Sequence, residues 1–322
     1  MKISVIVCTH NPRKDYLERT LDALRKQTLP IENWELLLID NASNQPLIDK
    51  WDLSWHPHSR HIREDEQGLT PARLRGILES NGEILVFVDD DNLLSSDYLE
   101  ESLGISHNYP IIGCWGAGII RPEFELAPSP ELAPYTSYLA LRNIDQPIWG
   151  NSPKVIPIPW GAGLVVRKHI ALAYNSIINK CSVRSKLDRS GAELNCGGDD
   201  EFSWVSYENG YGIGVFPNLK VIHLINKHRV EREYLIKLIE KNAYSHALLS
   251  YVHKQKIEIP KTPITLSDIL NYFLRLRLLK TLESISKYIV QFKTSKISIA
   301  HQLARNRGIE SAKKDLRQDL FK

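Results

Sequence analysis

Three apolar segments in the first 90 residues constrain the fold more than any other feature of the chain. The segments KISVIVC (2–8), WELLLI (34–39) and EILVFV (83–88) are short, rich in aliphatic residues, and each is followed by polar residues. Such runs are typical of strands that are buried on both faces of a parallel sheet. Segments with helical apolar spacing lie between them. We therefore expect an α/β fold with a mostly parallel central sheet and helices on both faces.

Helix and strand signals refine this expectation. Thr70 and Pro71 form a typical helix start, with Thr70 as the cap and Pro71 in the first helical position. Residues 213–216 and 219–224 are expected to form two short strands. In parallel sheets, ligands bind beyond the carboxyl ends of the strands. The polar clusters that should meet there are Thr9-His10-Asn11, Asp40-Asn41 and Asp89-Asp90-Asp91.

Three adjacent carboxylates, Asp89, Asp90 and Asp91, follow the strand at 83–88 directly. Because like charges repel, a hard divalent cation among them would stabilise the cluster. Side chains alternate in extended backbone, which places Asp89 and Asp91 on one side and Asp90 on the other. The alternative is that these residues only supply negative charge near a helix N-terminus.

A second acidic cluster, GGDDEF at 197–202, precedes a predicted helix. Negative charge at a helix N-terminus would explain one or two of its three carboxylates. A carboxylate on a glycine-flanked turn can instead point into a pocket and act as a general base. We therefore expect one acidic cluster to bind a metal and the other to move a proton.

Size and composition are those of a soluble globular protein. With 322 residues, 43% of them hydrophobic, the chain can bury a large core without disulfides or a structural metal. The four cysteines form no zinc-binding pattern, which indicates a reducing compartment. No apolar run reaches the roughly 20 residues of a membrane span, and the N-terminal one is too short for a signal peptide. We expect a cytoplasmic protein.

Charge is distributed unevenly along the chain. Residues 1–225 hold 21 Lys and Arg against 29 Asp and Glu, whereas residues 226–322 hold 20 against 9. This basic tail is predicted to be helical, with 264–292 apolar on one side. It could contact the anionic inner face of the cell membrane peripherally, or pack on the rest of the chain or on a second copy in a homo-oligomer. Nucleic-acid binding is not expected, because the basic residues lie among apolar ones.

Seven motifs, in this order, resemble family 2 glycosyltransferases of the GT-A fold. They are SVIVCTHNP, LLLIDNAS, EQGLTPARLRGI, ILVFVDDDN, WGAG, GGDDEF and VIH, and they cover about residues 1–230. The resemblance implies a nucleotide-sugar-binding half at 1–105, an acceptor-binding half of the same domain at 106–228, and a helical extension at 229–322. It also implies that Mn²⁺ or Mg²⁺ assists an inverting transfer from a nucleoside-diphosphate sugar to a hydroxyl of a glycan or lipid-linked acceptor. Members of this kind serve cell-surface polysaccharide or glycan synthesis.

The resemblance also implies roles for individual residues. Asp89 and Asp91 correspond to the D-x-D pair, the first toward the ribose and the second on the metal, with His223 as a further metal ligand. Asp200 corresponds to the base that takes a proton from the acceptor hydroxyl. The other implied substrate-binding residues are Thr9, His10, Asn11, Asp40, Arg73, Trp160, Gly161 and Asp199.

Some of these assignments have alternatives. Asp199 stands where the family usually has Glu, so the base could be Asp199, Asp200 or Glu201, and we favour Asp200. Three residues could instead be structural. His223 could be a buried histidine, Asp40 could start an Asx turn, and Trp160 could be a core tryptophan.

Other functional classes fit the motifs less well. Diguanylate cyclases carry GG-[DE]-EF, and GGDDEF has one Asp too many. A phosphatase of the D-x-D-x-T type needs Thr where Leu93 stands, and a sugar-nucleotidyl transferase needs a Gly-rich loop where this chain has CTHNPRK. The remaining alternative is a nucleotide-sugar-binding module without catalysis.

Overall fold

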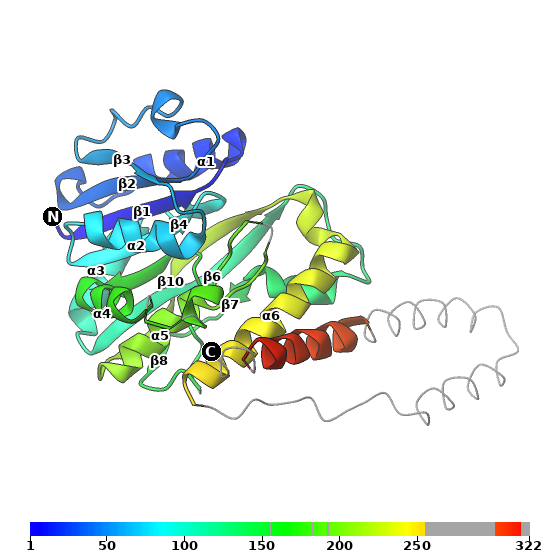
Figure 1. Ribbon diagram of the computed structural model, residues 1–322. Helices are drawn as coiled ribbons and strands as arrows, with labels where there is room; N and C mark the ends of the chain where they lie inside the picture. The colour runs from blue at the N-terminus through cyan, green and yellow to red at the C-terminus, as the bar shows by residue number, and fades with distance from the viewer. Residues whose placement is uncertain (155, 179, 182, 192, 255–299, 317–322) are drawn as a thin grey trace, which may run out of the picture.

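A ten-stranded sheet forms the centre of the molecule (Figure 1). The computed structural model describes residues 1–154, 156–178, 180–181, 183–191, 193–254 and 300–316. The strands are β1 (Ile3–Thr9), β2 (Trp34–Asn41), β3 (Ser59–Glu64), β4 (Ile84–Asp89), β5 (Asn92–Leu94), β6 (Ile112–Phe124), β7 (Arg142–Asn143), β8 (Ile148–Gly150), β9 (Leu164–Arg167) and β10 (Gly212–Ile225). Their order is β3-β2-β1-β4-β9-β6-β10-β5, with β7 beside β6 and β8 beside β10.

Six α-helices, a further helix at 300–316 and several 3₁₀ turns surround the sheet in the described part of the chain. The α-helices are α1 (Lys14–Arg25), α2 (Leu69–Glu79), α3 (Tyr98–Asn108), α4 (Lys168–Ile178), α5 (Gly198–Glu208) and α6 (Arg232–Val252). The 3₁₀ turns are η1 (Ile31–Asn33), η2 (Leu47–Asp49), η3 (Ala133–Leu139), η4 (Arg184–Lys186) and η5 (Lys227–Val230).

The six longest strands point in one direction. Strands β3, β2, β1 and β4 pair in parallel, and so do β6 and β10. The short strand β9 lies between β4 and β6 and is antiparallel to both, so β6 keeps the direction of β4. The predicted mostly parallel sheet is therefore confirmed.

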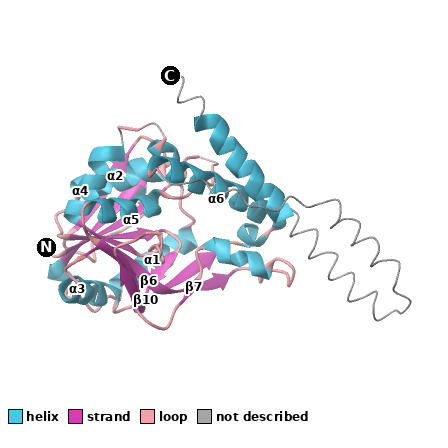
Figure 2. Cartoon of the chain, turned by 90° about the horizontal axis from the view of Figure 1, so that it is seen from below, coloured by secondary structure: helices cyan, strands magenta, loops and turns pink. Residues whose placement is uncertain are grey.

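Helices cover both faces of the sheet (Figure 2). Along β1, Ile3, Val5 and Val7 belong to the apolar cluster that contains α1 and α3. Ile6 and Cys8 belong to the cluster that contains α2, α4 and α5. Because side chains alternate along a strand, this mostly apolar strand buries residues on both sides. The prediction of helices on both faces is confirmed.

Two local predictions were wrong. Helix α2 begins at Leu69, so Thr70 lies inside it, and its buried hydroxyl donates a hydrogen bond of 3.3 Å to Asp188 instead of capping the helix. The predicted strands at 213–216 and 219–224 form the single long strand β10. Its pairing with β6 shifts register between Phe216 and Lys220, around Pro217, which cannot donate to a strand ladder.

The helix at 300–316 packs along α6 (Figures 1 and 2). A Cβ on Gly308 would clash with the backbone carbonyl oxygen of Glu240, so this crossing needs glycine. Ala312 and Leu316 join Leu248 in an apolar cluster. The described part of the tail thus packs on the rest of the chain, while segment 264–292 lies outside the described residues. Within that described part, no helix is long and apolar enough to cross a membrane.

Candidate active site

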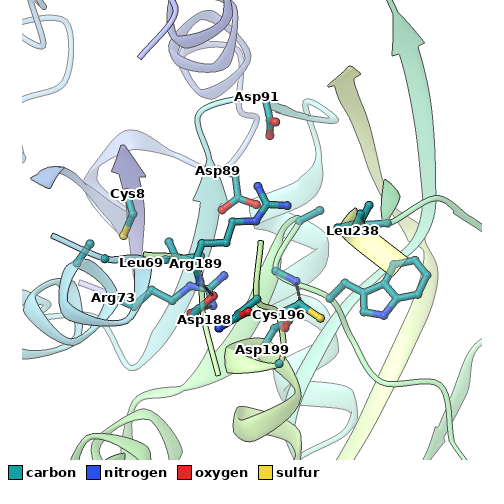
Figure 3. Close-up of a pocket in the computed structure, with 18 of the residues that line it drawn as sticks. Cys8, Leu69, Arg73, Asp89, Asp91, Asp188, Arg189, Cys196, Asp199 and Leu238 are labelled. Atoms are coloured by element: carbon teal, nitrogen blue, oxygen red, sulfur yellow. Dashed lines mark hydrogen bonds and ion pairs between the residues drawn. The ribbon is translucent and has the colours of Figure 1, made fainter. Parts of the chain in front are cut away.

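A cavity of about 630 Å³ lies at the carboxyl ends of β1, β2 and β4 (Figure 3). Its size is in the range of roughly 300–1,000 Å³ that is typical of small-molecule sites. Residues from 188–191 and 195–200, together with α6, supply other walls. Ten of the twelve predicted site residues line it: Thr9, His10, Arg73, Asp89, Asp91, Trp160, Gly161, Asp199, Asp200 and His223.

The acid triplet lies in the cavity wall, and its members differ in their surroundings. Burial raises the pKa of Asp90 to about 7, with a further rise from the charge of Asp91, although Asp90 accepts a hydrogen bond from the Thr9 hydroxyl. Burial also raises the pKa of Asp89. For Asp91, the effect of burial is outweighed by His223 and Arg229, which lower its pKa below the ordinary value. Asp91 is therefore the most readily ionised carboxylate of the three.

Arg229 holds Asp91 and His223 together. Its Nη1 lies 2.8 Å from Asp91 Oδ2 and 2.9 Å from His223 Nε2, and those two atoms are 3.4 Å apart. The antiparallel pairing of β5 with β10 sets Asn92 opposite His223, which brings the histidine beside the acid triplet. His223 is buried, and its Nδ1 has no hydrogen-bond partner among the residues described. Within the same residues, no group of three or more His, Cys, Asp or Glu could hold a metal ion.

Arg73 and Asp188 form a buried ion pair of 3.1 Å beside the cavity. A Cβ on Gly161 would lie 2.7 Å from Arg73 Nη2, and a Cβ on Gly198 would clash with Asp188 Oδ2. Glycine at these two positions of the WGAG and GGDDEF motifs therefore leaves room for the ion pair. Asp89 also acts on the Arg73 guanidinium through its charge.

The three carboxylates of GGDDEF have different environments. Asp199 Oδ2 accepts a hydrogen bond of 2.7 Å from the Gly161 amide. Glu201 is fully buried and pairs with Arg184 and, at 2.6 Å, with His253. Asp200 lines the cavity, and no hydrogen bond or ion pair to its carboxylate is formed by the described residues. Burial raises the pKa of Asp200 well above its ordinary value, and the charge of Asp199 raises it further.

Trp160 joins the cavity wall to the core. Its side chain packs against a core cluster and also lines the cavity. The Arg142 guanidinium lies 3.8 Å from the Trp160 ring centroid and donates a hydrogen bond of 2.7 Å to the Ile158 carbonyl. Burial lowers the pKa of Arg142 to about 10, against the charges of Asp199 and Asp200. The ring is thus held in place by a cation on one face.

The two remaining predicted residues, Asp40 and Asn11, bind the loop that follows β2. Asp40 accepts hydrogen bonds of 3.0 and 3.1 Å from backbone amides of that loop and pairs with Arg63 at 2.9 Å. The Asn11 backbone amide donates a hydrogen bond of 2.9 Å to the Ser43 hydroxyl oxygen. Neither Asp40 nor Asn11 lines the cavity, whereas Asn41 does. Their predicted contacts with a nucleotide stay predictions.

Helix α6 forms a wall that no sequence motif indicates. The residues of α6 that line the cavity lie four positions apart along the helix: Leu238, Asn242 and His246. Ser245 Oγ accepts a hydrogen bond of 3.0 Å from the Cys196 amide. A Cβ on Gly197, which has a φ of 112°, would lie 2.9 Å from Leu249 Cδ1. Helix α6 therefore supports the turn from which α5, and with it Asp200, begins.

Asp188, Arg189 and Arg229 also line the cavity and were not predicted. Asp188 and Arg189 lie in an irregular region without periodicity, and Arg229 lies at the start of the basic tail. The one available sequence signal, which concerns Asp188, was Arg73, because a buried arginine requires a counter-ion.

Comparisons with known proteins find similarity to one group of proteins. Residues 4–154 match the family described as glycosyl transferase family 2. The glycosyltransferase AglE of Haloferax volcanii is 29% identical over 104 residues, which are 31% of this chain and 34% of that protein. The poly(ribitol-phosphate) beta-N-acetylglucosaminyltransferase TarS of Staphylococcus aureus is 26% identical over 154 residues, 45% of this chain and 26% of that protein. The chain thus spans about a third or less of these curated relatives.

The likeness extends to the fold. The crystal structure of GalNAc-T7 with UDP, GalNAc and Mn²⁺ has a TM-score of 0.50 at 18% identity, covering 91% of this chain and 57% of that chain.

Proposed function

The chain belongs to glycosyl transferase family 2 and has the GT-A fold, and from this premise we propose that it transfers a sugar from a nucleoside-diphosphate donor to a hydroxyl acceptor with inversion. The observation that carries the proposal is that one cavity holds Asp89 and Asp91 on one wall and Asp200 on another. The names of similar proteins, TarS among them, support a role in cell-surface polysaccharide synthesis.

Asp200 is the proposed general base. Its carboxylate faces the cavity without a partner among the described residues, and its raised pKa makes it a better proton acceptor than an exposed aspartate. In a single displacement, Asp200 would take the proton of the acceptor hydroxyl while the diphosphate leaves from the opposite face of the sugar. Asp199 and Glu201 are less suited, because their carboxylates already bind Gly161 and Arg184.

Asp91 and His223 are the residues that would hold Mn²⁺ or Mg²⁺. They fit a divalent ion because Asp91 Oδ2 and His223 Nε2 lie 3.4 Å apart and already contact one cation, the Arg229 guanidinium. An oxygen and a nitrogen ligand suit Mn²⁺, with further oxygens from a diphosphate. A bound ion would stabilise the negative charge that develops on the departing diphosphate. Arg229 would then have to release Asp91.

The remaining assignments follow the position of each segment around the cavity. Within 1–105, we assign Thr9, His10 and Asn41 to the nucleotide, and Asp89 to the ribose. Within 106–228, we assign Trp160 and Gly161 to the sugar and the acceptor. Within 229–322, α6 supplies one wall of the cavity. We place the reaction in the cytoplasm, with a glycan or lipid-linked acceptor.

Thermal stabilisation by a panel of nucleoside-diphosphate sugars, with and without Mn²⁺, tests this function. A donor that binds the native state raises the melting temperature in proportion to the logarithm of its concentration above Kd. We expect one nucleotide class to stabilise the chain only with the metal. Metal-dependent hydrolysis of that donor would separate an enzyme from a binding module without catalysis, and stabilisation by no member of the panel would contradict the proposal.

A further inference from the structure

Arg189 has a fixed backbone and a free side chain. Its carbonyl oxygen accepts a hydrogen bond of 2.9 Å from the Leu69 amide, and the neighbouring Ser190 hydroxyl donates one of 3.3 Å to the Gln67 carbonyl. The side chain extends from beside Asp188 toward Asp89 (Figure 3). No hydrogen bond or ion pair from the guanidinium to another described residue is formed. Its donors are therefore available to a ligand in the cavity.

The other two arginines of the cavity lining differ from Arg189 in this respect. Arg73 is paired with Asp188, and Arg229 is paired with Asp91. Arg189 is thus the cation in this part of the described lining that can bind an anion without breaking an existing ion pair.

Charge keeps the Arg189 guanidinium among the carboxylates. Desolvation beside the carboxylates would by itself lower its pKa, but Tyr234 and the carboxylates of Asp89 and Asp91 outweigh this and raise it. In return, the charge of Arg189 lowers the pKa of both aspartates. The guanidinium therefore supplies positive charge where the proposed metal would add more and where a diphosphate would bring negative charge.

We propose that Arg189 binds the diphosphate of the sugar donor. This rests on the proposed function, since it assigns a further contact to the same substrate. A guanidinium presents parallel N–H donors that match two phosphate oxygens, which an ammonium group cannot do. The Arg189 side chain is long enough, positively charged and has free donors for this role. The hydrogen bond from the Leu69 amide fixes the backbone from which this side chain extends.

Calorimetric titration of the full chain with inorganic pyrophosphate tests the proposal without knowledge of the base or the sugar. In the presence of Mn²⁺, R189A should bind pyrophosphate about ten- to a hundredfold more weakly than the wild type, as expected for the loss of a charged hydrogen-bonding group. R189K should fall between the two. Titration with Mn²⁺ alone should show equal or tighter binding by R189A, because a cation has been removed from beside Asp91.

This pair of effects separates a phosphate contact from a general loss of structure. If Arg189 had a merely structural role, R189A would bind both Mn²⁺ and pyrophosphate more weakly. If Arg189 contacts phosphate, only the binding of pyrophosphate is weakened. R75A is the matched control, since Arg75 is paired with Glu79 on α2 and does not line the cavity. R189Q, which keeps a polar side chain of similar reach, is the second variant if R189A does not fold.

The outcomes distinguish the inference from the function on which it rests. If wild type and R189A bind pyrophosphate equally, Arg189 is not a diphosphate ligand, and the proposed function stands. If the wild type binds neither pyrophosphate nor any nucleoside diphosphate, the proposed function fails and the inference fails with it.

Discussion

The Arg73 guanidinium lies 3.1 Å from the Asp188 carboxylate, and both side chains are buried beside the cavity. This ion pair joins α2 to the loop before α5, two segments separated by 115 positions in the sequence. Gly161 and Gly198 approach it so closely that a methyl group at either position would require the pair to shift. Residues of three motifs are thus arranged around one pair of charges.

Replacing Arg73 should therefore destabilise the fold. R73A leaves Asp188 buried without its counter-ion, and breaking a buried pair in this way costs about 3–5 kcal/mol of the free energy of unfolding. Urea denaturation at pH 7 measures the loss. R75A, which removes the same charge from the exposed side of α2, should change the free energy by about 0.5 kcal/mol or less. Equal effects of the two variants would contradict a structural role for the ion pair.

Replacing Asp200 should separate binding from catalysis. D200N keeps the shape of the side chain but cannot take the proton from the acceptor hydroxyl. We therefore expect the rate of sugar transfer to fall by about 10²- to 10⁴-fold. Nucleotide and Mn²⁺ affinities should stay at wild-type values, because no described residue forms a hydrogen bond or ion pair with this carboxylate. Titration calorimetry on D200N and a product assay provide both readouts. A fully active D200N would remove Asp200 from its assigned role.

The raised pKa of Asp200 predicts an unusual pH dependence. Only the deprotonated carboxylate can act as a base, and burial holds its pKa well above the ordinary range of aspartate. The transfer rate at saturating donor should therefore fall as the pH is lowered through this raised pKa, at a higher pH than for an exposed aspartate. The residual rate of D200N should lack this acidic limb. A wild-type rate that stays flat down to the ordinary range of aspartate would argue against the assignment.

Replacing Asp91 should abolish metal-dependent nucleotide binding. D91A removes the carboxylate that lies beside His223 and leaves Arg229 without its ionic partner. Thermal shifts with a nucleoside diphosphate should then be the same with and without Mn²⁺. D22A, a substitution of an exposed aspartate on α1, should keep the difference. Metal-dependent stabilisation of D91A at the wild-type level would rule out this residue as a ligand.

Two glycine substitutions should have opposite effects on stability. G308A places a methyl group against the Glu240 carbonyl and should lower the free energy of unfolding by about 1–3 kcal/mol. G104A, in the interior of α3, places its methyl group in open space and should raise the same quantity by about 0.5–1 kcal/mol. Thermal denaturation of both variants measures the contrast. A neutral G308A would mean that the helix at 300–316 is not held against α6 at this point.

Local sequence patterns were sufficient for the sheet and for the side of the cavity that the strand ends form. The parallel strands β1 and β4 are mostly apolar, and the polar residues at their ends, Thr9 and Asp89, must lie at one sheet edge. The same reasoning failed at Thr70, because its hydroxyl binds Asp188, a residue 118 positions away in the sequence. Propensity describes only the neighbours of a residue along the chain.

The opposite side of the cavity could not be predicted for a related reason. Arg189 lies in a loop without periodicity, and its position depends on a backbone hydrogen bond to Leu69. Strand β9 enters the sheet antiparallel between β4 and β6, which no local pattern indicates. The contribution of α6 depends on how a helix packs against a turn formed earlier in the chain.

The support that Ser245 and Leu249 give to the turn at Cys196–Gly197 has a consequence for biosynthesis. A ribosome makes these two residues after every strand of the sheet. A nascent chain can therefore assemble the strands of the sheet while the turn that precedes Asp200 still lacks these contacts. On the proposed function, transfer would then have to wait until Ser245 and Leu249 have been synthesised.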